Sequence, residues 1–172
     1  MQLKFDEYFM SMALREAEKA AKAGEVPTGC VIIEASEEDT MPAAVKILAK
    51  THNQAESLCD ATAHAEMLAL SAAFASRGAW RLTNTVLYVT KEPCPMCAGA
   101  IALARIPRVV WGVSDPKRGG QTVFNVFTHP GMNHHPEVTQ GILEDGCKAI
   151  LQSFFKQRRS EAREKSICTQ QQ

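Results

Sequence analysis

Two segments of strand length enclose a short helical segment in the second half of the chain, and this arrangement constrains the fold most. The segments 85–90 and 108–113 are rich in valine and aromatic residues, which favour strands. The helix expected between them, 96–104, consists largely of alanine and glycine, so it can pack closely against a sheet. This βαβ-like unit predicts an α/β fold in which helices cover a sheet.

Three further helices are expected from apolar residues that recur at spacings of three and four. The first covers 6–22 and the last covers 147 to about 165. The third covers 63–77, where Thr62 is placed to cap its start and Gly78 to end it.

A hairpin is expected early in the chain. Its strands are the apolar segments 29–33 and 45–49, and the acidic, turn-rich segment 36–42 separates them. The resulting order of helix, hairpin, helix, strand, helix, strand and helix predicts a mixed sheet within one domain that spans residues 1–172.

Composition agrees with one packed domain of 172 residues, because 45% of the residues are hydrophobic and 22% are charged. Nineteen Lys and Arg balance nineteen Asp and Glu, so no overall field draws the molecule to nucleic acid. From Lys148 onward, however, six basic residues face only two acidic ones. This basic segment is either a solvated helix end or a local contact for a nucleic acid.

The sequence also bears on compartment. Its longest uncharged apolar stretch, 93–104, is shorter than the roughly 20 residues that cross a bilayer, and no basic-then-apolar leader is present. We therefore expect a soluble cytoplasmic protein. The six cysteines are too few for a disulfide scaffold, so metal or redox chemistry is the better expectation.

The residues most suited to chemistry stand at two expected helix starts. Cys94 and Cys97 lie three apart at the first turn of one helix, where free amide groups favour thiolates. Alone, this pair fits redox chemistry, a structural metal or a catalytic metal. His64 at the start of the neighbouring helix adds a nitrogen ligand, and a His-Cys-Cys set suits a tetrahedral zinc ion with one position left for water.

Glu66 lies two residues beyond His64, close enough to reach a zinc-bound water without binding the metal. It can accept a proton from that water as a general base and later donate a proton as a general acid. The competing interpretation is a structural zinc site, which needs a fourth protein ligand. The candidates for that ligand are Cys59, His52, His129, His134 and Cys147.

The two motifs, within Ala61–Met67 and Leu87–Ile101, resemble the established signature of the zinc nucleobase deaminases in the cytidine/deoxycytidylate deaminase superfamily. Further segments are similar to the tRNA-specific adenosine deaminase branch: 25–27, Asn53, 105–112, 129–134, 154–155 and 158–159. The chain departs from that branch in its long hairpin 34–50 and at Gln54, Ala55, Ala61 and 121–122.

The resemblance implies a cytidine-deaminase-like three-layer α/β/α fold with a mixed sheet of about five strands, a core over about 6–160, and a C-terminal helix with a basic tail over 147–172. It implies hydrolytic deamination of adenosine to inosine at the wobble position of a tRNA anticodon loop, by a homodimer. The alternatives are a deaminase of free guanine or cytosine, or of their nucleosides, and a non-catalytic zinc module.

The resemblance also assigns residues. It implies one Zn²⁺ per subunit held by His64, Cys94 and Cys97, with Glu66 as the proton carrier. It implies contacts to the base or to the RNA from Val26, Asn53, Ala65, Asp115, Lys117, Phe155 and Arg159.

Overall fold

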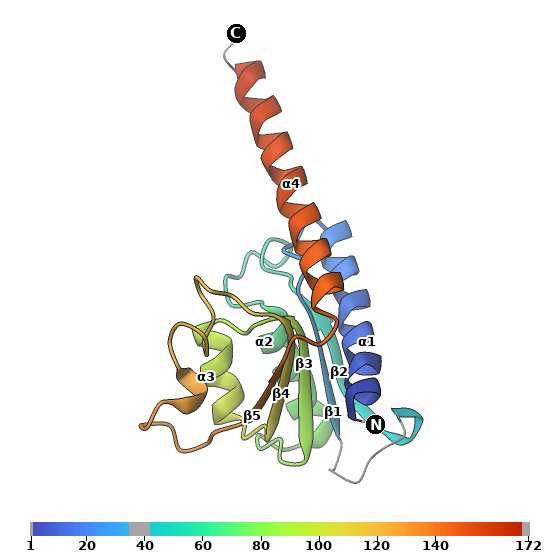
Figure 1. Cartoon of the computed structure of the whole chain (residues 1–172), viewed down its shortest axis with the longest axis vertical. Helices are drawn as coiled ribbons and strands as arrows, with labels where there is room; N and C mark the ends of the chain where they lie inside the picture. Colours follow the sequence, from blue (N-terminus) through green and yellow to red (C-terminus); the bar gives the residue numbers. More distant parts are fainter. Residues whose placement is uncertain (1, 35–41, 170–172) are drawn as a thin grey trace.

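A five-stranded sheet lies between two pairs of helices (Figure 1). The computed structural model describes residues 2–34 and 42–169. The helices are α1 (Gln2–Lys22), α2 (Ala65–Arg77), α3 (Pro95–Leu103) and α4 (Glu144–Thr169), with short 3₁₀ turns at η1 (Pro42–Ala44) and η2 (Val126–Thr128). The strands are β1 (Gly29–Glu34), β2 (Lys46–His52), β3 (Thr85–Lys91), β4 (Arg108–Val113) and β5 (Glu137–Gln140).

The sheet is mixed, in the order β2-β1-β3-β4-β5. β1 pairs antiparallel with both β2 and β3, whereas β3, β4 and β5 run parallel. The expected hairpin and βαβ unit are therefore confirmed, and so is the expected sheet of about five strands.

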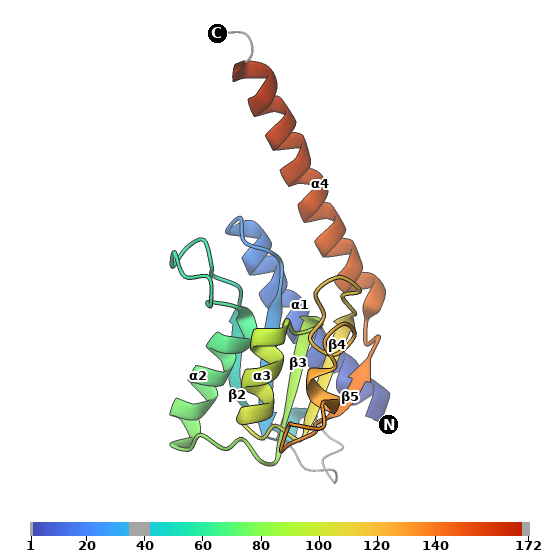
Figure 2. The ribbon, with the colours of Figure 1, turned by 90° about the vertical axis from the view of Figure 1, so that its left-hand side faces the viewer.

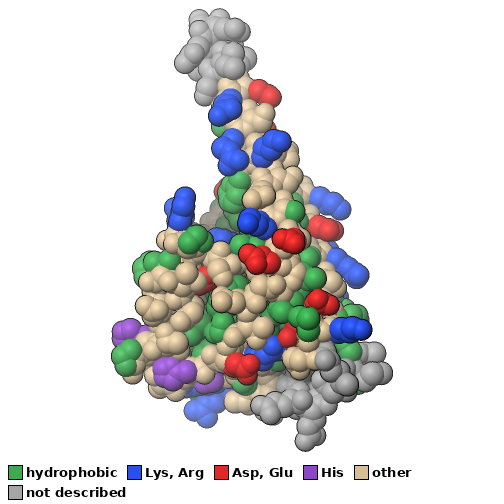
Figure 3. Space-filling view, viewed as in Figure 1, with side chains coloured by type: hydrophobic (Ala, Val, Ile, Leu, Met, Phe, Trp, Pro, Cys, Tyr) green, Lys and Arg blue, Asp and Glu red, His purple; other side chains and the backbone are tan. Residues whose placement is uncertain are grey.

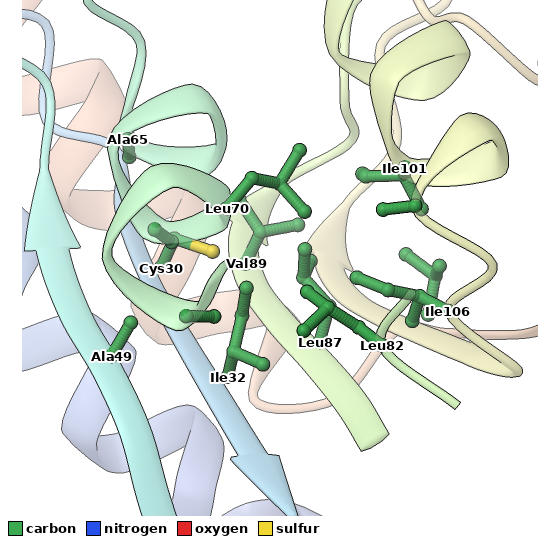
Figure 4. Packing of buried hydrophobic residues seen from close by; sticks show 14 of the residues in the cluster. Cys30, Ile32, Ala49, Ala65, Leu70, Leu82, Leu87, Val89, Ile101 and Ile106 are labelled. Carbon is green, nitrogen blue, oxygen red and sulfur yellow. The ribbon is translucent and has the colours of Figure 1, made fainter. Parts of the chain in front are cut away.

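The two faces of the sheet bury different side chains, because successive residues of a strand point to opposite sides. From β3, Leu87 and Val89 enter the core under α2 and α3, and Val86 and Tyr88 enter the core under α1 and α4. Figure 2 shows α2 and α3 on one side of the sheet and α1 and α4 on the other. Figure 4 shows Leu87, Val89 and Leu70 packed together in the first core.

An ion pair between the buried Asp6 and the partly buried Arg108 ties the second core together. The guanidinium of Arg108 on β4 donates to both carboxylate oxygens of Asp6 on α1, each at 2.8 Å. The Tyr88 hydroxyl donates to Asp6 Oδ1 at 2.8 Å, and Arg108 also donates to Thr139 Oγ1 on β5. One carboxylate therefore links α1 to the middle of the sheet.

Several element boundaries differ from the sequence prediction. Helix α2 begins at Ala65 with His64 as its cap residue, and Thr62 does not cap it. The Thr62 hydroxyl instead donates to Asp60 Oδ1 at 2.7 Å, which holds it in the preceding turn. The sequence patterns also did not predict strand β5. The tip of the predicted hairpin, over 36–41, lies outside the described residues.

Helix α4 is longer than predicted and projects from the body of the molecule (Figure 1). Figure 3 shows Lys and Arg side chains along the projecting part. Lys156, Arg158, Arg159 and Arg163 are all exposed there. No helix among the described residues is both long and apolar enough to cross a membrane.

Candidate active site

The first turns of α2 and α3 bring one imidazole and two thiols together. His64 and Cys94 are the cap residues of these helices and both have extended backbones. His64 Nδ1 lies 3.6 Å from Cys94 Sγ and 3.5 Å from Cys97 Sγ. Their ligand atoms all lie within 4.8 Å of one another, as the sequence analysis expected.

These distances fit a tetrahedral metal site. Zinc–sulfur and zinc–nitrogen bonds of about 2.3 and 2.05 Å at a tetrahedral angle separate the two ligand atoms by about 3.6 Å. The observed nitrogen–sulfur distances of 3.5 and 3.6 Å match that value. Both nitrogen–sulfur separations of the donor set are therefore compatible with a tetrahedral metal ion.

The two thiols also shift each other's pKa in opposite directions. Hydrogen bonds from Cys97 and His64 lower the pKa of Cys94 to about 4. The neighbouring Cys94 sulfur and burial raise the pKa of Cys97 well above its usual range. Without a cation one sulfur thus ionises readily and the other does not, whereas a divalent ion favours both thiolates.

The fourth ligand of a purely structural site is not present among the described residues. His52 Nδ1 lies 3.4 Å from a carboxylate oxygen of Glu16, and His134 Nε2 contacts the carbonyl of Ile106. Cys147 packs in the core on the other face of the sheet. Neither Cys59 nor His129 joins the cluster of ligand atoms.

Glu66 occupies the first turn of α2, beside the cluster. Its side chain is almost fully buried, at 3% exposure, and it lines the same pocket as His64 and Cys94. Burial raises the pKa of Glu66 to about 7, although a hydrogen bond with Cys97 and the charge of His64 oppose the rise. A carboxyl group is thus held against the metal-ligand cluster in a largely water-excluded position.

The pocket above this cluster has a volume of about 570 Å³. Of the residues predicted to contact substrate, Val26, Asn53 and Phe155 line it. Ala65 is fully buried in the core under α2, and Figure 4 shows it there. Arg159 lies in a neighbouring groove that it shares with Phe155.

Asp115 and Lys117 lie in the loop after β4 and do not line the pocket. The Asp115 carboxylate accepts from Lys91 Nζ at 2.6 Å and from the amides of Lys117 and Arg118. Partial burial opposes its ionisation, but these hydrogen bonds more than compensate and the pKa of Asp115 falls below its usual value. Arg118, which the sequence analysis did not single out, does line the pocket.

A buried carboxylate also organises this loop. Glu92 is 3% exposed and accepts from the amides of Asp115, Gln121 and Thr122 and from the Thr122 hydroxyl. Gly119 lies so close that a Cβ there would clash with the Glu92 carboxyl group. In the sequence, only the position of Glu92 just before the Cys motif indicates that it belongs to the site.

A second buried carboxylate lines the same pocket. Glu25 is fully buried and lines the pocket. It accepts from Asn53 Nδ2, from the amides of Glu56 and Ser57, and from the Ser57 hydroxyl. In the sequence, Glu25 belongs to the segment 25–27 that is similar to the tRNA-specific branch, but no role was predicted for it. Nothing in the local sequence indicates that an acidic residue is buried.

The fold and this site define the class of protein, a nucleobase deaminase, and a family model for MafB19-like deaminases matches residues 5–159. The tRNA-specific adenosine deaminase of Streptococcus pyogenes is 44% identical over 153 residues, covering 88% of this chain and 91% of that protein. Its counterpart in Bacillus subtilis is 43% identical over 157 residues, covering 91% and 92%. The chain therefore belongs to the tRNA-specific adenosine deaminase family.

A solved structure supports this assignment. It comes from a study of A-to-I editing by tRNA deaminases at the wobble position of transfer RNA. It superposes with a TM-score of 0.76 at 38% identity, and the match covers 84% of this chain and 99% of that chain. The cytidine-deaminase-like α/β fold expected from the sequence is therefore confirmed.

Proposed function

We propose that this protein hydrolyses adenosine to inosine at the wobble position of a tRNA anticodon loop. The observation that carries the proposal is the buried Glu66 carboxyl group beside the His64, Cys94 and Cys97 cluster at the end of the pocket. The curated relatives and the tRNA deaminase structure support the substrate.

We further propose that His64, Cys94 and Cys97 hold one Zn²⁺ per subunit. The nitrogen–sulfur distances of 3.5 and 3.6 Å and the thiolate-rich donor set support this metal. When bound, Zn²⁺ polarises a water molecule and lowers its pKa toward neutrality.

Glu66 would then carry the protons of the reaction. Its carboxylate takes a proton from the attacking water as the water oxygen bonds to C6 of adenine, and it passes this proton to N1, which receives the electron pair of the opened C6–N1 double bond. It then moves the remaining proton of the C6 hydroxyl to the exocyclic nitrogen, so that the C6 carbonyl forms, the C6–N6 bond breaks and ammonia leaves. The buried position of Glu66 keeps bulk water from exchanging that proton, and its place on the first turn of α2 fixes it relative to His64.

The substrate base must leave its stack to reach this depth, which a single-stranded anticodon loop permits. Val26 and Phe155 provide exposed apolar surface at the pocket, with Val26 at 37% and Phe155 at 44% exposure. Arg158 also lines the pocket, stacks on Phe154 and donates to the carbonyl of Gly24. The exposed basic residues of α4 would meet the phosphates.

The direct test incubates the protein with a transcribed tRNA that carries adenosine at the wobble position and scores inosine, beside free adenosine, guanine and cytosine. Glu66→Ala should retain zinc and its melting temperature but form no inosine. Turnover of free guanine or cytosine with none on tRNA would favour the alternative deaminase function. Inosine formation by Glu66→Ala would remove the proton-carrier role.

Truncation after Phe155 separates these functions further. It removes Arg158 and the projecting part of α4 while leaving the metal cluster intact. An enzyme that acts on tRNA should lose most activity, whereas an enzyme for free bases should keep it.

We also propose a cytoplasmic homodimer. The tRNA substrate supports the location, and exposed apolar side chains on and after α3 support the assembly: Leu103 at 66% and Phe124 at 53% exposure. Light scattering of the purified protein tests the dimer, and Leu103→Glu should shift it toward monomer.

A further inference from the structure

A buried carboxylate outside any ion pair lines the pocket. Glu25 is 0% exposed, and no Lys, Arg or His of the described residues lies within ion-pair distance of it. Such a group is costly to bury unless hydrogen bonds replace its water. Although burial opposes ionisation, its hydrogen bonds hold the pKa of Glu25 below the usual value, so it is a carboxylate at neutral pH.

The donors to Glu25 divide into two sets. Oε1 accepts from the Ser57 amide and the Ser57 hydroxyl, each at 2.8 Å. Oε2 accepts from Asn53 Nδ2 and from the Glu56 amide, each at 3.2 Å. All four donors belong to the segment that follows β2, so this carboxylate fixes that segment against the turn after α1.

The bond to Asn53 has a further consequence because an ionised carboxylate only accepts hydrogen bonds. The amide nitrogen of Asn53 must therefore face Glu25, and its carbonyl oxygen must face away. A side-chain amide otherwise has two orientations that exchange donor and acceptor. Asn53 lines the pocket at 7% exposure, and its backbone amide is held by the carbonyl of Thr28 at 3.0 Å.

We propose that Glu25 is a positioning residue that locks the Asn53 amide in one orientation, so that Asn53 presents a defined donor and acceptor to the substrate base. Glu25 acts through Asn53 and does not touch the reacting atoms. This inference rests on the proposed function, in which the pocket receives the adenine.

Glu25→Gln tests the lock with almost no change in shape. The oxygen of the new glutamine should stay on the Ser57 side, where the two bonds are shorter, so its NH2 group faces Asn53, and Asn53 must turn around to accept with its oxygen. We expect kcat/KM on tRNA to fall by about tenfold to a hundredfold. Ser57→Ala is the matched control, because it removes a donor from Glu25 but leaves the Asn53 bond, and it should change kcat/KM by less than about twofold.

A double-mutant cycle separates positioning from general stability. Asn53→Ala should lower kcat/KM, and Glu25→Gln added to Asn53→Ala should lower it by less than about twofold more. If the two losses multiply instead, Glu25 does not act through Asn53 and the proposal is wrong. If Glu25→Gln does not fold, Glu25→Asp keeps the charge, shortens the side chain away from Asn53 and enters the same cycle.

A readout without substrate keeps this result distinct from the proposed function. In nitrogen-15 NMR spectra of the free protein, one Asn53 side-chain amide proton should be shifted downfield and protected from exchange. That signature should persist in Ser57→Ala and disappear in Glu25→Gln. Its persistence in Glu25→Gln overturns the proposal, whereas absence of inosine formation by the wild type overturns the proposed function alone.

Discussion

Removal of the Arg108 guanidinium is expected to destabilise the protein severely without touching the pocket. Arg108→Met retains an unbranched apolar side chain but deletes both 2.8 Å hydrogen bonds to the Asp6 carboxylate. The Asp6 side chain is only 3% exposed, so water does not replace the lost donors. Asp6 then keeps the hydroxyl of Tyr88 and the more distant amide of Gln2 as its donors.

Breaking a buried ion pair by removing one partner costs about 3–5 kcal/mol. With a urea dependence of about 2 kcal/mol per molar, the unfolding midpoint should fall by roughly 1.5–2.5 M. Circular dichroism at fixed protein and zinc concentrations measures that midpoint. The kcat/KM of the folded variant on tRNA should remain that of the wild type, because Arg108 does not line the pocket.

The double variant Asp6→Asn with Arg108→Met removes both charges and serves as the control. It should recover a large part of the lost stability, since no uncompensated charge remains buried. A shift below about 0.5 M for Arg108→Met, or a double variant less stable than Arg108→Met, would refute this account of the ion pair.

Three other predictions concern the site. Cys94→Ala should lose most bound zinc by metal analysis, while Cys59→Ala, an exposed cysteine outside the cluster, should keep it; equal zinc contents would disprove the ligand assignment. Gly119→Ala should lower both melting temperature and activity, because the added Cβ meets the Glu92 carboxyl group, and a fully active, equally stable variant would contradict that contact. Asp115 has a lowered pKa, so its stabilisation is present above its unfolded pKa of about 3.9 and is lost as pH falls through the lower folded value. The difference in melting temperature between wild type and Asp115→Asn should therefore shrink from pH 6 to pH 3, and a constant difference would argue against this linkage.

Local patterns predicted the parts of the fold that have strong local signals. The strands at 85–90 and 108–113 are central and buried, so their valine and aromatic residues are conspicuous, and Gly78 ends α2 in a left-handed conformation as expected. β5 is short, lies at the sheet edge and is only half-buried, so its residues lack that signal. Thr62 is a good cap by residue type, but its bond to Asp60 is made in a turn that local preference does not reveal.

The convergence of His64, Cys94 and Cys97 was predictable because helix starts place these residues at fixed positions. The burial of Glu25 and Glu92 was not predictable, since it depends on segments far away in sequence. Glu25 binds residues 28 to 32 positions away, and Glu92 binds residues 23 to 30 positions away. In the sequence, an acidic residue followed by an apolar one gives the same pattern whether its side chain is solvated or buried.

The two-residue spacing of His64 and Glu66 on one rigid helical turn has an evolutionary consequence. Covalent geometry, and not the surrounding loops, sets the separation of the proposed metal ligand His64 from the proposed proton carrier Glu66. The segments held by Glu25 and Glu92 can therefore change in length and composition while the chemical step is inherited intact. Substitutions selected for binding a different nucleic acid would accumulate in those segments. The turn that carries His64 and Glu66 would remain unchanged.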